Sequence, residues 1–179
     1  MFCGKCSVRS VSVGLGSLSL SIFLLGCAPA PTVNAPAASA APIAASTGVG
    51  QYLPITAQAK IADRTIQLEV AETPQQQALG LMYRPELSDD QGMLFPFSPA
   101  RTVNFWMKDV PVALDMVFLY QGKVVAIADQ VPPCKTIASA CPTYGPREFV
   151  DQVIELRAGR AQALNLQVGD RVTVTFLQR

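Results

Sequence analysis

Residues 114–128 read LDMVFLYQGKVVAIA, and this stretch decides the class of fold. Two apolar runs rich in β-branched and aromatic residues flank the dipeptide Gln121-Gly122. A two-residue connection that contains glycine is typical of a tight turn between antiparallel strands. The stretch therefore predicts a β-hairpin, and with it an antiparallel sheet.

Further short strands are expected on both sides of this hairpin. Residues 55–72 read as two strands that meet at Ala62-Asp63, and residues 92–97, 102–110, 149–156 and 171–177 read as single strands. Thr73-Pro74 is typical of a helix start, with Pro85 as its end, and a second short helix is expected after Gly159. Residues 52–179 are thus predicted to form one α+β domain, a β-rich fold with a mostly antiparallel sheet or half-open barrel and one or two short helices.

The first 26 residues have the pattern of a lipoprotein signal peptide. Lys5 and Arg9 give a basic start, residues 11–26 are apolar and uncharged, and Leu24-Leu25-Gly26-Cys27 resembles a bacterial lipobox. On this interpretation Cys27 is lipidated and anchors the protein to a membrane, facing the periplasm or the cell exterior. The alternative is an ordinary secretory signal followed by an unrelated cysteine.

Residues 27–51 are expected to be a flexible tether. Beyond Cys27 the stretch contains mainly alanine, proline and other small residues, and it carries no charge. Such a composition buries too little apolar surface to offset the entropy lost on ordering. The tether would hold the globular domain away from the lipid surface.

Export decides how the cysteines are interpreted. Removal of the signal would leave Cys134 and Cys141 as the pair in the globular part, with six residues between them. In an oxidising compartment such a pair is best explained by a disulfide. A metal site would need more ligands than this pair supplies, so no metal is expected.

Several functional classes do not fit the composition. The chain has no histidine, which excludes Ser-His and Cys-His catalytic pairs and histidine-ligated metals. It contains no glycine-rich phosphate loop. Its formal net charge is +1, and its basic residues do not cluster into a stripe. No cofactor is therefore expected, and nucleic acid is not an expected partner.

The most unusual feature is a group of charged residues inside apolar segments. Alternation places Trp106 and Lys108 on one face of residues 102–110, and Asp115 on the less apolar face of the next strand. Together with Arg84 these residues form a candidate ligand-binding cluster, in which Trp106 would be a flat wall and the charges would orient a polar group. The alternative is an ion pair of Asp115 with a cation that fixes strand register and leaves no site.

Glu155 lies in the apolar run Val153-Ile154-Glu155-Leu156 and is expected to point outward from an alternating strand. If it instead faced Asp115, the two acids would be catalytic candidates of the kind that glycosidases use. Tyr144 could line the same mouth or could pack as a core aromatic.

The ordered motifs of the domain resemble those of the family numbered as domain of unknown function 192. The resemblance implies one compact β-rich domain, often exported, and supports the paired cysteines, but it implies no activity. It covers nearly all of the globular part and rests on Gly80-Leu81-Met82-Tyr83-Arg84, Gly92-Met93-Leu94-Phe95, Phe105-Trp106-Met107-Lys108-Asp109, Leu114-Asp115, Pro132-Pro133-Cys134, Cys141-Pro142-Thr143-Tyr144, Val153-Ile154-Glu155-Leu156 and Gly169-Asp170.

Three functional hypotheses follow. The first is a lipid-anchored binding or accessory module that recognises a small polar ligand or an envelope component. The second is an envelope glycan hydrolase with Asp115 and Glu155 as paired carboxylates. The third is a structural, partner-binding lipoprotein whose charged cluster only supports the fold. No enzyme activity is assigned by the sequence.

Overall fold

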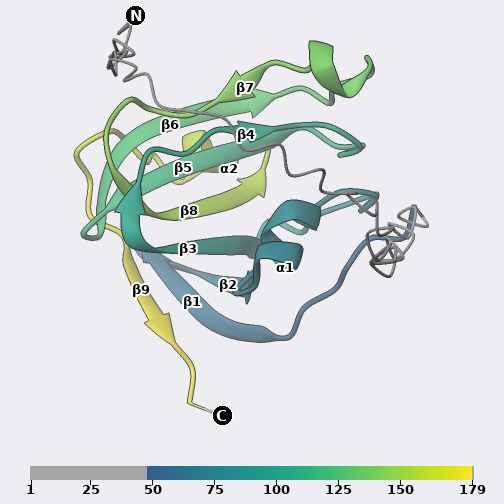
Figure 1. The fold of residues 1–179 in the computed structure, drawn as a ribbon. Helices are drawn as coiled ribbons and strands as arrows, with labels where there is room; N and C mark the ends of the chain where they lie inside the picture. Colours follow the sequence, from purple (N-terminus) through teal and green to yellow (C-terminus); the bar gives the residue numbers. More distant parts are fainter. Residues whose placement is uncertain (1–47, 179) are drawn as a thin grey trace, which may run out of the picture. The chain divides into compact units, whose positions relative to one another are not determined.

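The structure is a computed structural model that describes residues 48–178 (Figure 1). The signal segment 1–26, Cys27 and most of the tether 27–51 lie outside the described residues. No described helix is both long enough and apolar enough to cross a membrane. The elements are β1 (Ile55–Ile61), β2 (Arg64–Val70), α1 (Pro74–Leu79), β3 (Gln91–Arg101), β4 (Phe105–Trp106), β5 (Leu114–Tyr120), β6 (Lys123–Val131), the 3-10 turn η1 (Ala138–Ala140), β7 (Thr143–Tyr144), β8 (Val150–Arg157), α2 (Arg160–Ala163) and β9 (Thr173–Phe176).

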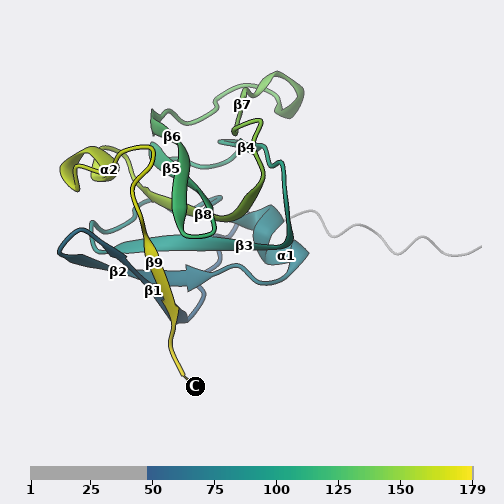
Figure 2. The same cartoon turned by 90° about the vertical axis from the view of Figure 1, so that its left-hand side faces the viewer.

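Seven strands form one sheet in the order β6-β5-β8-β3-β2-β1-β9. All pairs are antiparallel except β2 with β3, which is parallel. The sheet curls so that the chain leading into β9 returns to the β5–β6 hairpin, where the Val172 amide donates to the Gly122 carbonyl at 2.9 Å (Figures 1 and 2). The β-rich α+β domain with a half-open barrel is therefore confirmed.

Both faces of the central strands are buried. The inner face of the curl holds one apolar cluster, to which α2 contributes Ala161. The outer face holds a second cluster, formed with the segment after α1 and with the separate two-stranded sheet of β4 and β7. Strands buried on both faces lose the polar–apolar alternation of a half-exposed sheet, which explains the consecutive apolar residues 116–119 of β5 and 153–154 of β8.

The cap of α1 is as predicted, but the helix is shorter than expected. The Thr73 hydroxyl accepts from the Gln76 amide at 3.2 Å, and Pro74 occupies the first turn. The helix ends at Leu79 rather than near Pro85, because Gly80 adopts a φ of 47° that a helix does not allow. The expected strand 102–110 is likewise reduced to β4, whose partner is β7 and not the main sheet.

Candidate functional site

Asp115 is fully buried and is bound by backbone amides. Its Oδ1 accepts from the amides of Gln130 at 2.7 Å and Gly159 at 3.0 Å, and its Oδ2 accepts from Ala161 at 2.7 Å. Hydrogen bonds to an ionised group are among the strongest in proteins and compensate the cost of burying its charge. Asp115 therefore connects β6 and the start of α2 to β5, and it is part of the scaffold.

Arg84 is also committed to the scaffold. Its guanidinium contacts Glu69 at 2.6 Å, and both side chains are almost completely buried. The second oxygen of Glu69 accepts from the Leu53 amide at 2.7 Å, and the ring of Tyr52 lies 4.3 Å from the guanidinium carbon. Arg84 thus fastens the chain entering β1 to β2.

Replacement of Arg84 by methionine should lower the free energy of unfolding by about 3 kcal/mol, because Glu69 would remain buried without its cation. The same change at the partly exposed Lys108 should cost less than about 1 kcal/mol. Urea unfolding of the full-length variants measures both values. Equal, small losses for the two variants would show that the buried pair adds nothing to stability.

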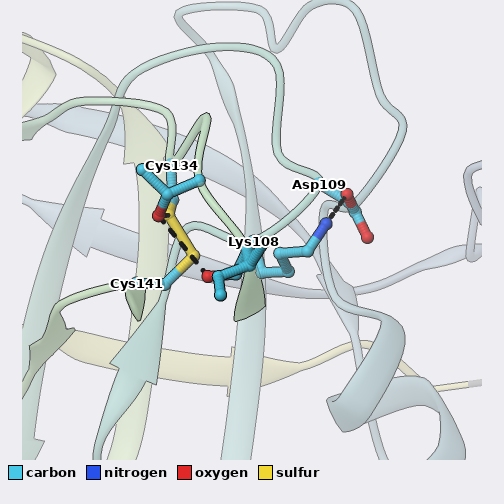
Figure 3. The surroundings of a disulfide bond; sticks show 6 residues. Lys108, Asp109, Cys134 and Cys141 are labelled. Carbon is cyan, nitrogen blue, oxygen red and sulfur yellow. Dashed lines mark hydrogen bonds and ion pairs between the residues drawn. A yellow bond between two sulfur atoms is a disulfide. The ribbon is translucent and has the colours of Figure 1, made fainter. Parts of the chain in front are cut away.

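Lys108 pairs with its neighbour Asp109 rather than with Asp115 (Figure 3). The Tyr83 hydroxyl also donates to Asp109, at 3.0 Å. The hydrogen bond from Lys108 lowers the pKa of Asp109 below its usual value, and the bond from Tyr83 acts in the same direction. Lys108 is therefore used in a local ion pair at the surface.

The expected meeting of Lys108 with Asp115 is wrong because the two side chains belong to opposite sides of the sheet. The segment that carries Lys108 packs over the outer cluster with Met116 and Phe118, whereas Asp115 points inward toward α2. Alternation within each strand cannot tell which faces of two strands meet. Arg84, Trp106, Lys108 and Asp115 consequently do not converge on one site.

The cysteine pair is joined as expected. Cys134 and Cys141 form a disulfide with a Cα–Cα distance of 5.7 Å (Figure 3). Beside it, the backbones of Lys108 and Cys134 form an isolated β-bridge. The loop that it closes leads directly into β7, the partner of β4. The disulfide therefore restrains the strand against which Trp106 is placed.

Trp106, the only tryptophan in the chain, lies at the wall of a hollow of about 420 Å³. Its side chain is 41% exposed, and the Phe95 and Phe105 rings meet edge to face at 5.1 Å beside it. The guanidinium of Arg101 lies 4.7 Å from the Phe97 ring, and no carboxylate of residues 48–178 pairs with it. The complete lining is Gln77, Ala78, Phe95, Phe97, Arg101, Thr102, Val103, Asn104, Phe105 and Trp106.

A smaller cavity of about 40 Å³ adjoins this hollow and contains Glu155. The two share Gln77, Ala78, Phe95, Phe105 and Trp106 as lining residues. Glu155 is 5% exposed, and burial alone raises the pKa of its carboxyl to about 8. The expected outward position of Glu155 is therefore wrong, because its strand β8 lies between β3 and β5 and has no exposed face there.

The structure separates Glu155 from Asp115. In the β5–β8 ladder Glu155 lies opposite Met116, and Asp115 lies opposite Leu156. Adjacent positions along a strand point to opposite faces, so the two carboxyl groups are on opposite sides of the sheet. They cannot act together on one glycosidic bond.

Tyr144 does not line the aromatic hollow. It pairs with Phe105 across β4 and β7, and it borders a different depression together with Phe118 and Ala126. Sequence reasoning missed Arg101, Phe95, Phe97 and Phe105, because alternation gave the phenylalanines the ordinary pattern of core strands and Arg101 lay outside every expected strand. The available signal was Glu155, an acid within the apolar run Val153-Ile154-Glu155-Leu156.

These observations define a small barrel-like domain with an aromatic hollow and a buried acid beside it. Residues 55–174 match the family model of DUF192, which is described as "Uncharacterized ACR, COG1430". The match spans most of the chain, so the chain belongs to this family.

Two solved structures are similar to this chain. One, described as a "putative transcription regulator" from Sinorhizobium meliloti 1021, is 32% identical with a TM-score of 0.60, and the match covers 70% of this chain and 98% of that one. The other is a protein of unknown function from Novosphingobium aromaticivorans DSM 12444, 28% identical with a TM-score of 0.58 and coverage of 66% and 83% respectively. A comparison with curated proteins finds no match.

Proposed function

We propose that this protein is a binding module that takes a small, partly apolar ligand in the aromatic hollow beside α1 and β4. The hollow of about 420 Å³ falls within the roughly 300–1,000 Å³ that is usual for small-molecule sites. Trp106 and the phenylalanines offer flat apolar walls, while Arg101 and Asn104 offer polar contacts at its edge. Of the four residues in the candidate cluster predicted from the sequence, only Trp106 lines this hollow.

The observation that carries this proposal is the position of Trp106. A partly exposed tryptophan beside a hollow lined also by Arg101, which has no carboxylate partner among residues 48–178, is suited to a ligand with a flat apolar part and a polar or anionic group. Arg84 and Lys108 form ion pairs within the fold, Asp115 accepts from backbone amides, and none of the three lines this hollow.

Occupancy of the hollow can be measured through the single indole N–H signal of Trp106. Toluene, added to the full-length protein in detergent, should shift this NMR signal in a saturable manner. The change Ala78→Phe fills the hollow from α1 and should abolish the shift, because Ala78 lines it. Gln75→Phe adds the same ring to an exposed α1 position outside the lining and should preserve the shift.

An equal response in the Ala78→Phe and Gln75→Phe variants would contradict binding in the hollow. The absence of any saturable shift in the unaltered protein would remove the proposal altogether.

We also propose that the module is exported and held at a membrane by a lipid on Cys27. The basic start, the apolar stretch and the lipobox-like end of residues 1–27 support this, as does the uncharged stretch that follows. A labelled fatty acid should be incorporated into the protein, and Cys27→Ala should abolish the label while Cys3→Ala retains it. Labelling that persists without Cys27 would refute the anchor.

A further inference from the structure

We propose that Glu155 acts as a hydrogen-bond donor at the inner end of the aromatic hollow, and that the ligand is a flat, mainly apolar molecule with a projecting uncharged carbonyl oxygen. This inference deepens the proposed function and rests on it. It assigns a chemical class to the ligand and a role to a residue that the fold itself does not use.

Glu155 is unusual among the buried acids of the described domain. Glu69 has Arg84 and a backbone amide, and Asp115 has three backbone amides. Glu155 is 95% removed from solvent, and no group of residues 48–178 donates a hydrogen bond to its carboxyl. A polar group that is buried without a partner costs free energy unless water or a ligand satisfies it.

The surroundings of Glu155 keep it in the acid form. The small cavity is lined from α1 by Gln77, Ala78 and Leu79, and from the following segment by Gly80, Leu81 and Met82. Its remaining walls are Phe95, Phe105, Trp106 and Val110, and Met93 and Met116 flank Glu155 in the sheet. None of these side chains is charged or titrates near neutral pH. Since burial raises the pKa of Glu155 to about 8, the carboxyl is a neutral donor at pH 7.

The size and the lining of the cavity select the group that can reach this donor. A volume of about 40 Å³ has room for a water molecule, a carbonyl oxygen or a primary ammonium, but the apolar lining offers a cation no compensating charge while Glu155 is protonated. The rings that border both cavities would hold the flat body of the same molecule in the larger hollow. The geometry therefore favours an aryl ketone, amide or related carbonyl compound over an organic cation.

The test compares acetophenone, toluene and benzylamine, each titrated against the Trp106 indole signal of the full-length protein in detergent. Glu155→Leu should weaken acetophenone binding about tenfold, the effect of one lost hydrogen bond, and leave toluene unchanged. Because partition into the micelles is the same for every variant, ratios between variants report the site alone. Val168→Ala, an exposed change away from the hollow, should alter neither affinity.

The pH dependence of acetophenone affinity distinguishes a Glu155 that donates a hydrogen bond to the ligand from one that only supports the fold. Acetophenone affinity should fall as the pH rises through 8, as the donor loses its proton, and should level off about tenfold lower once Glu155 is ionised. Glu155→Gln retains an N–H donor and should keep the affinity while removing the pH dependence. Toluene binding should be insensitive to this ionisation, apart from its effect on folding.

The outcomes distinguish the two proposals. Equal affinity of acetophenone for the protein and its Glu155→Leu variant would overturn the role of Glu155, and saturable toluene binding would leave the hollow as a site. Stronger binding of benzylamine with rising pH would overturn the carbonyl class in favour of a cation. Failure of all three probes to bind would overturn both proposals.

Discussion

Replacement of Asp115 by alanine is expected to lower the free energy of unfolding by about 5 kcal/mol, which is a large part of the stability of a domain of this size. Three backbone amides, those of Gln130, Gly159 and Ala161, would lose a charged acceptor in the protein interior. Each hydrogen bond to a charged group contributes roughly 1.5–3 kcal/mol, and a buried donor left without a partner adds its own penalty.

Urea unfolding followed by circular dichroism gives this difference. Asp115→Asn should cost less, because its amide oxygen still accepts, although its NH₂ group meets one of the donors. Asp129→Ala, at an exposed position of β6, should change stability by less than about 0.5 kcal/mol. If Asp115→Ala is as mild as Asp129→Ala, the assignment of Asp115 to the scaffold is wrong.

Glu155→Gln is expected to stabilise the protein increasingly as the pH rises. In the unfolded chain the carboxyl ionises near 4.5, whereas in the folded protein its pKa is about 8. The folded state therefore holds one more proton between these values, and stability decreases as pH rises through this range. The stability contributed by protonated Glu155 is fully present below pH 4.5 and is lost by about pH 8. Over this pH range the free energy of unfolding should fall by roughly 5 kcal/mol.

The difference in unfolding free energy between Glu155→Gln and the unaltered protein should thus grow by up to roughly 1.4 kcal/mol per pH unit from pH 5 to 8 and then level off. Chemical unfolding at a series of pH values measures it. Glu148→Gln, at an exposed position just before β8, should show no such trend. A flat difference for Glu155→Gln would mean that the folded protein accommodates the carboxylate without penalty.

Local patterns predicted most of the fold. The turn at Gln121-Gly122, the cap at Thr73 and the short helix after Gly159 all depend on neighbouring residues, and all three are present. The early end of α1 at Gly80 was missed because glycine within a helical pattern does not by itself specify a positive φ. The length of β4 was missed because its partner β7 is another two-residue strand far along the chain.

The site was less predictable, because it depends on how strands are ordered across the sheet. The consecutive apolar residues of β5 show that this strand is buried, but not that Asp115 faces α2 while Met116 faces the outer cluster. Likewise, the central place of β8 follows from pairing with β3 and β5, and only this pairing explains why Glu155 is buried beside a small cavity. Long-range pairing of this kind leaves no periodic signal.

The two buried acids illustrate why charge in an apolar segment has more than one explanation. Asp115 is supplied with donors by the backbone, so its burial supports the fold and leaves nothing for a ligand. Glu155 receives no donor from the part of the chain that the structure describes, and burial raises its pKa to about 8, so a neutral polar group is available at the edge of a cavity. Of the two, the acid without a partner is the better candidate for function.

Carbon-13 NMR of the Glu155 side-chain carboxyl, followed against pH in the full-length protein, tests the central claim most directly. We predict that this signal remains that of a carboxylic acid through pH 7 and titrates with a midpoint near the value of about 8 that burial imposes. Saturating acetophenone should move the midpoint upward, because it binds the protonated form. A midpoint near 4.5, unchanged by acetophenone, would contradict both the neutral acid and its role in the hollow.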